Sequence, residues 1–106
     1  MENQEKIQQM HFLEQNLQAI LMQKQAFQME LSEIDLSLKE IANSGEDIYK
    51  IIGQLMLKVQ KNKIIEELNS KQSLVKSRIK NLEKQEENLS EQSKKIREEI
   101  LKSNKK

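Results

Sequence analysis

Apolar residues recur at alternating spacings of three and four along the first half of this chain. Nine of ten positions at this spacing are apolar, and the exception is Lys24. These positions, called the first seam, are Met10, Leu13, Leu17, Ile20, Lys24, Phe27, Leu31, Ile34, Leu38 and Ile41. Two apolar positions in every seven form a narrow stripe along a helix, as in a coiled coil. The pattern predicts a helix over about residues 2–43.

The second half of the chain repeats this pattern less strictly, with eight of eleven positions apolar. This second seam consists of Ile65, Leu68, Gln72, Val75, Ile79, Leu82, Glu86, Leu89, Ser93, Ile96 and Ile100. The chain has no proline, and its two glycines, Gly45 and Gly53, lie between the seams. A second helix, over about residues 61–102, can therefore run without a break.

Each predicted helix is long and needs a partner along its length, because a narrow apolar stripe buries little by itself. Antiparallel pairing brings one seam against the other. The facing pairs are then Ile41 with Ile65, Leu38 with Leu68, Leu31 with Val75 and Phe27 with Ile79. The predicted fold is mainly α, a long antiparallel two-helix coiled coil in a single domain that spans residues 1–106.

Polar residues interrupt both seams. Lys24 falls one layer from Glu86, which predicts an ion pair across the seam; alternatively, both side chains extend outward independently. Glu86 and Ser93 weaken the outer half of the second seam. The coiled coil is therefore expected to be loosest where both termini lie.

The connector between the helices carries its own pattern. Asn43, Ser44 and Gly45 are typical of a helix C-terminus. Two apolar runs, residues 48–52 and 55–59, then flank Gly53 and Gln54. This arrangement predicts a β-hairpin over about residues 47–60.

The predicted hairpin has apolar residues on both faces. Leu55, Leu57 and Val59 share one face of the second strand, and Ile48 and Ile52 share a face of the first. Tyr49 and Ile51 take the opposite face. An isolated two-stranded hairpin is marginally stable, and two helices cannot cover both of its faces. Hairpins from several subunits are therefore expected to pair into a shared sheet or barrel, the alternative being a flexible apolar loop.

Composition and charge narrow the possible functions. The 106 residues include 18 basic and 17 acidic side chains, no cysteine and a single histidine. The absence of cysteine excludes disulfides and thiolate metal sites. No apolar run approaches the length of a membrane span, and the polar N-terminus lacks a signal-peptide pattern. We expect a soluble, intracellular protein without membrane association.

No catalytic arrangement is recognisable in the sequence. His11 is the only histidine and is predicted to face solvent, so a two-histidine metal site or a Ser-His-Asp triad is excluded. The glycines form no phosphate-binding loop, and the Glu residues alternate with Lys on helix faces, as solvated ion pairs do. The chain is expected to be no enzyme and to hold no cofactor or metal.

Binding to nucleic acid is also poorly supported. The only arginines are Arg78 and Arg97, and the lysines are balanced by glutamates. Lys102, Lys105 and Lys106 give the C-terminus a local basic excess, which more often marks a solubilising end than a binding arm.

The connector resembles the hairpin signature of archaeal β-type subunits of the prefoldin family, V-Y-K-L-V-G-P-V-L-V-K. Tyr49, Lys50, Gly53 and Lys58 match it as identities, while Gln54 stands where a proline is common. The segment from Leu17 to Gln25 and the order helix, single hairpin, helix are also similar. The resemblance implies a hexamer of two α and four β subunits with hairpins in a double β-barrel body. It further implies a cytoplasmic, ATP-independent chaperone that captures unfolded proteins at the coiled-coil tips and passes them to a group II chaperonin.

Client capture needs apolar side chains that are accessible before binding. At the end of the coiled coil with both termini, the candidates are Ile7, Met10, Phe12, Leu13, Ile96, Ile100 and Leu101. Phe12 and Leu101 lie off the seams and are expected to face solvent. Met10, Leu13 and Ile96 fit equally well as ordinary coiled-coil core. The off-seam residues Met22, Met29 and Leu36 either extend a client surface or are incidental.

A structural tether without chaperone activity is the alternative function. It accounts for both seams but gives no reason for an apolar hairpin.

Overall fold

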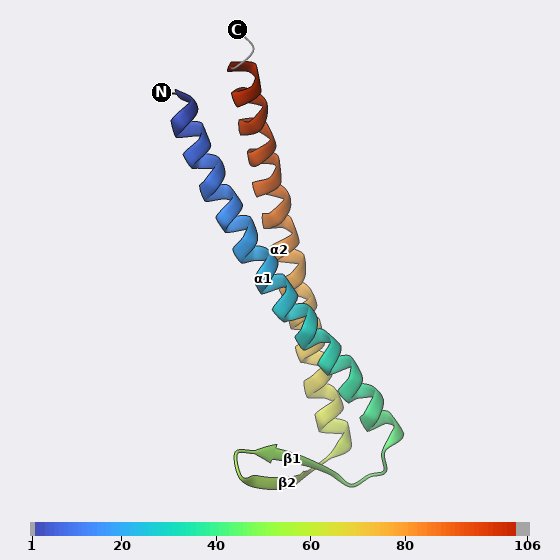
Figure 1. Cartoon of the computed structure of the whole chain (residues 1–106). Helices are drawn as coiled ribbons and strands as arrows, with labels where there is room; N and C mark the ends of the chain where they lie inside the picture. Colours follow the sequence, from blue (N-terminus) through green and yellow to red (C-terminus); the bar gives the residue numbers. More distant parts are fainter. Residues whose placement is uncertain (1, 104–106) are drawn as a thin grey trace. The chain divides into compact units, whose positions relative to one another are not determined.

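Two long helices and one hairpin make up the computed structural model, which describes residues 2–103 (Figure 1). Helix α1 spans Glu2–Asn43, strands β1 and β2 span Ile48–Ile52 and Leu55–Val59, and helix α2 spans Lys61–Ser103. The predicted fold class, two long helices joined by a single antiparallel hairpin, is confirmed. Lys105 and Lys106 of the basic C-terminus lie outside the described residues.

The chain divides into two compact units. Unit 1 consists of Met1–Ala26 with Ile79–Lys106, and unit 2 consists of Phe27–Arg78. In both units every first-seam and second-seam position is buried or half-buried, whereas most other positions on the helices are exposed. The seven-residue pattern therefore identifies the packed side of each helix.

Unit 1 pairs the N-terminal part of α1 with the C-terminal part of α2. Leu13, Ile20 and Leu82 form its buried apolar core. The Nζ of Lys24 lies 3.3 Å from the Oε1 of Glu86, which confirms the predicted ion pair across the seam. Polar groups this close to an apolar core are tolerated because they bond to one another.

The second ion pair of unit 1 lies close to the termini. Lys6 Nζ is 3.6 Å from Glu99 Oε2, so the first turns of α1 lie beside the last turns of α2. Ser93, the small member of the second seam, is buried to 7% exposure. Helix α2 continues past it to Ser103.

Unit 2 contains the remainder of both helices and the hairpin. Ile34 and Val75 are its buried apolar residues. Gln72, the polar member of the second seam in this unit, donates a hydrogen bond of 2.6 Å from Nε2 to Asp35 Oδ1 on α1. The Arg78 guanidinium lies 5.7 Å from the centre of the Phe27 ring, within cation–π range.

The end of α1 is closed by a serine. The backbone N–H and the hydroxyl of Ser44 both donate to the carbonyl of Ile41, at 3.2 and 2.8 Å. Gly45 has no positive φ, so the expected helix end does not use a left-handed glycine. Lys61 Nζ donates to the Ser44 carbonyl at 3.0 Å and thereby ties the start of α2 to the end of α1.

The hairpin turns through two residues, Gly53 and Gln54, with Ile52 paired to Leu55. Gly53 has a φ of 59° and is the only described residue with a positive φ. A two-residue turn with positive φ at its first position alone has the signature of type II′, in which glycine is strongly favoured. This turn preserves the twist of the strands on either side.

Candidate functional site

The hairpin presents two apolar faces. Directly paired residues share a face, and the register from Ile48 with Val59 to Ile52 with Leu55 sorts them. Face A carries Ile48, Lys50, Ile52, Leu55, Leu57 and Val59, and face B carries Tyr49, Ile51, Met56 and Lys58. All predicted assembly residues therefore lie on the hairpin or in its turn.

Most of these side chains remain uncovered within the chain. The exposed fractions are 53% for Tyr49, 69% for Ile51, 52% for Ile52, 64% for Leu55, 66% for Met56 and 46% for Leu57. Ile48 and Val59, nearest the helices, are half-buried. Large apolar side chains that are exposed on both faces of a two-stranded sheet indicate that the sheet packs against another protein surface.

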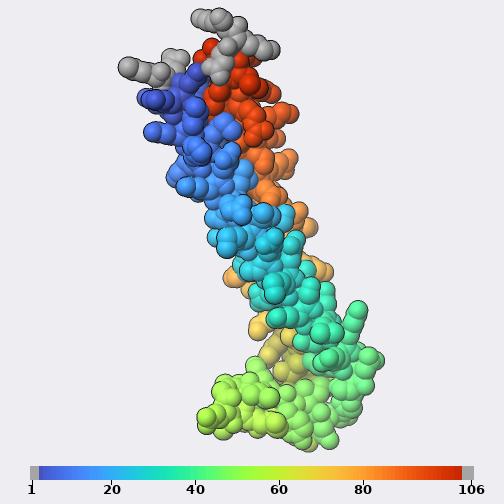
Figure 2. All heavy atoms as spheres, in the orientation of Figure 1, coloured from blue at the N-terminus to red at the C-terminus, as the bar shows by residue number. Residues whose placement is uncertain are grey.

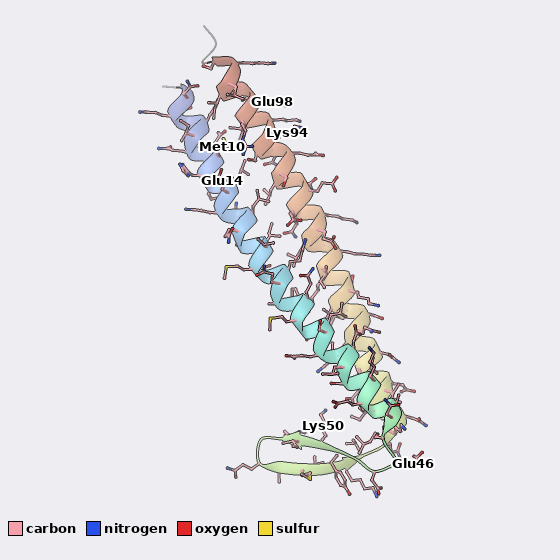
Figure 3. All side chains as sticks on the ribbon, turned by 45° about the vertical axis from the view of Figure 1, so that its right-hand side comes forward. Met10, Glu14, Glu46, Lys50, Lys94 and Glu98 are labelled. Atoms are coloured by element: carbon pink, nitrogen blue, oxygen red, sulfur yellow. The ribbon has the colours of Figure 1, made fainter. Side chains whose placement is uncertain are left out.

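The two lysines of the hairpin connect it to its surroundings in unit 2. Both form ion pairs. The Nζ of Lys50, on face A, lies 3.7 Å from the Oε2 of Glu67 on α2. The Nζ of Lys58, on face B, lies 3.2 Å from the Oδ1 of Asp47 in the connector. Figure 3 shows Lys50 on β1 and Glu46 in the connector that leads into this strand. Lys50 is the one charged residue of face A, and its ion pair links that face to α2.

A groove of about 480 Å³ lies between β1 and the adjoining helix ends of unit 2. Its apolar lining comes from Ile41 of α1, Ile48 of β1, and Ile64 and Leu68 of α2. Ionisable residues of both signs surround this lining. Such a mixed wall suits packing against another protein better than binding of a small charged ligand.

A second groove, of about 540 Å³, lies in unit 1 where the two helices reach their terminal ends. Phe12, Leu13 and Ile96 provide its apolar surface. Its remaining lining is Glu5, Gln8, Gln9 and Gln92, so only one of these residues carries a charge. Figure 3 shows Met10 and Glu14 on α1 beside the part of α2 that carries Lys94 and Glu98.

The predicted client-binding residues separate by accessibility. Ile7, Phe12 and Leu101 are exposed, with exposed fractions of 44%, 64% and 57%. Met10, Ile96 and Ile100 are half-buried in the seams.

Leu13 is only 7% exposed, which agrees with the second of its two predicted roles, an ordinary coiled-coil core position. Its seam position packs it into the core of unit 1, where it also lines the groove. The glutamines that line this groove, Gln8, Gln9 and Gln92, are called the glutamine rim and are not predicted from the sequence. The sequence feature that could have revealed it is the concentration of glutamines on either side of Met10.

Other kinds of site find no support in the part of the chain that the structure describes. Among residues 2–103, no group of three or more His, Asp or Glu side chains could hold a metal ion. None of the helices in this range has an apolar stretch long enough to cross a bilayer.

Two antiparallel helices joined by an exposed apolar hairpin place this chain in a structural class: subunits that consist of a helical coiled coil and one β-hairpin. A family model described as prefoldin subunit matches residues 4–106. The prefoldin subunit beta of Thermococcus onnurineus is 39% identical over 89 residues, which cover 82% of this chain and 77% of the relative. The prefoldin subunit beta of Thermococcus kodakarensis is 36% identical over 94 residues, which cover 87% of this chain and 80% of the relative.

A solved structure agrees with these relatives. The crystal structure of the prefoldin beta subunit from Thermococcus strain KS-1 superposes with a TM-score of 0.92 at 33% identity, covering 99% of this chain and 94% of that one. The chain belongs to the prefoldin family and is of the β type.

Proposed function

We propose that this chain is a subunit of an ATP-independent chaperone that holds non-native proteins and delivers them to a group II chaperonin. The partners are α-type prefoldin subunits and further β-type subunits, in a cytoplasmic hexamer of two α and four β chains. The observation that carries the proposal is the exposure of large apolar side chains on the hairpin and beside a groove whose lining includes a single charged residue, Glu5.

Assembly through the hairpin follows from its two open edges and two apolar faces. Among residues 2–103, β1 and β2 pair only with one another, so each strand keeps an outer edge with free backbone groups. Pairing with hairpins of other subunits satisfies these groups and covers Ile51 and Leu57. A shared barrel is the arrangement that removes every edge.

Capture of non-native protein is assigned to the groove of unit 1. Phe12 gives it a large exposed ring, and Leu13 and Ile96 complete its apolar lining. The glutamine rim can donate hydrogen bonds to, and accept them from, an unfolded backbone without selecting a sequence. This combination fits a client recognised by exposed apolar side chains rather than by a defined motif.

The proposal is tested by replacing Phe12, Ile100 and Leu101 with Ser in the full chain, assembled with α-type partners. We expect suppression of aggregation of a chemically denatured client to be lost while the mass of the assembly stays constant. The matched control replaces the exposed Leu36 and Leu74 of unit 2 with Ser, and should keep activity. Undiminished suppression by the triple variant would contradict the capture site, and an inactive wild-type assembly would favour a structural tether.

A further inference from the structure

Helix α1 carries an additional line of uncharged residues in unit 1, away from the first seam. Its members recur at alternating spacings of three and four, as the seam residues do. We call them the outer stripe: Phe12, Gln15, Ala19, Met22 and Ala26. All five are exposed, and the exposed fraction is 64% for both Phe12 and Met22.

The corresponding positions of α2 in this unit are different. Relative to the second seam they are Asn81, Lys84, Asn88, Glu91, Lys95, Glu98 and Lys102. None is apolar, and five of the seven are charged. A helix face that is merely solvated has this charged composition, so the outer stripe is a property of α1 and not of the coiled coil in general.

We propose that the outer stripe binds an amphipathic helix of the non-native client held by unit 1. This inference rests on the proposed function. It extends client contact from the groove of unit 1 along the flank of α1; the N-terminal part of this helix is drawn in blue in Figure 2. Phe12 connects the two surfaces, because it belongs to the outer stripe and lines the groove.

The spacing of the stripe favours a helical occupant over an extended one. Its members rise by about 5 Å from one to the next along the helix axis. Another helix with a seven-residue apolar repeat matches that interval, and its side chains can interdigitate with these. Side chains on one face of an extended strand recur every ~7 Å and fall out of step within a few residues.

The side chains of the stripe suit weak binding of varied helices. Ala19 and Ala26 let a partner backbone approach closely, while the thioether of Met22 adapts to differently shaped neighbours. The only charged side chains of α1 between Ile7 and Ala26 are Glu14 and Lys24. Lys24 is held by Glu86 across the seam, so it adds little charge to the flank.

The test compares two peptides of identical composition on the full chain assembled with α-type partners. Both are fluorescein-labelled 18-residue peptides of Leu, Ala, Gln and Lys. The helical probe has Leu at every third and fourth position, and the alternating probe has Leu at every second position. Binding is measured by fluorescence anisotropy, and aggregation of a denatured client is followed in parallel.

The test variant is Ala19→Glu with Met22→Glu, and its control is Asn81→Glu with Asn88→Glu on α2. All four positions are exposed, so both variants should keep their helical circular dichroism. We expect the test variant to weaken binding of the helical probe about tenfold or more, because docking would bury the new carboxylates without partners. Binding of the alternating probe to the groove should change little, and the control should bind both probes as wild type does.

Equal loss for both probes, or no loss for either, would overturn the inference. If wild type suppresses aggregation while the variants do not differ, the inference alone fails; if wild type binds neither probe and suppresses nothing, the proposed function fails too. Sedimentation velocity identifies one competing occupant. Concentration-dependent association of wild type that the test variant abolishes, without an effect on probe binding, would assign the stripe to a second copy of this chain.

Discussion

The ammonium of Lys24 lies 3.3 Å from a carboxylate oxygen of Glu86, in the unit whose buried apolar core is Leu13, Ile20 and Leu82. The two side chains are 18% and 32% exposed, so water reaches them only in part. A partly buried ion pair stabilises little compared with apolar packing, but loss of one partner leaves the other charge poorly solvated. The pair therefore specifies which layers of the two helices meet.

The first prediction concerns this pair. Lys24→Met should lower the free energy of unfolding by about 1–3 kcal/mol, because Glu86 then lacks its partner. The double variant Lys24→Met with Glu86→Leu should recover that loss or exceed wild-type stability. Thermal unfolding followed by circular dichroism measures both. A double variant that remains less stable than wild type would show that the pair stabilises the coiled coil more than apolar packing does.

The second prediction uses the two glycines as a matched pair. Gly53→Ala should destabilise the hairpin by about 1 kcal/mol, because its φ of 59° is strained for a residue with a Cβ. Neither glycine has an atom within 4 Å of the position that a Cβ would take, so steric contact is not the cause. Gly45→Ala should be neutral or slightly stabilising, since Gly45 has no positive φ. Thermal unfolding of the two variants in the assembly distinguishes them, and equal effects would exclude the turn conformation as the reason.

The seams show how far sequence patterns predict this fold. Burial of a helix side depends on periodicity alone, so even the polar seam members Lys24, Gln72 and Ser93 are found on the packed side. The ion pair of Lys24 with Glu86 is only one of two alternatives that the sequence allows. The pattern predicts which layers of the two helices meet, but not the rotamers of long side chains. The exposed hairpin likewise follows from its composition.

Features that depend on contacts between elements could not be derived in this way. The groove of unit 1 requires Phe12 and Gln92, from different helices, to border one space, which depends on the rotation of each helix about its axis. Ser44 ends α1 with its hydroxyl, although Gly45 next to it is the usual sequence signal. The ion pair of Lys50 with Glu67 depends on the direction in which the hairpin leaves the helices.

The third prediction tests assembly through the hairpin. Ile51 on face B and Leu57 on face A are 69% and 46% exposed in the chain, so Asp at either position costs the isolated subunit little. Ile51→Asp with Leu57→Asp should prevent association, because a subunit interface would bury two carboxylates without partners. Size-exclusion chromatography with light scattering should then show free subunits that keep their helical circular dichroism. An intact hexamer would refute the role of the hairpin.

The last prediction concerns the ion pair that links the hairpin to α2. Lys50 and Glu67 are about half exposed, so their attraction should contribute at most ~1 kcal/mol to stability. The ion pair is instead expected to hold the hairpin in the direction that assembly requires. Lys50→Glu should therefore lower the yield of assembled hexamer. The exchange of both charges, Lys50→Glu with Glu67→Lys, should restore that yield. The control is the more exposed pair of Lys58 and Asp47, both within the hairpin and its connector, where Lys58→Glu should matter less. Native mass spectrometry gives the yields. If the exchanged pair assembles no better than Lys50→Glu alone, Lys50 acts through face A rather than through Glu67.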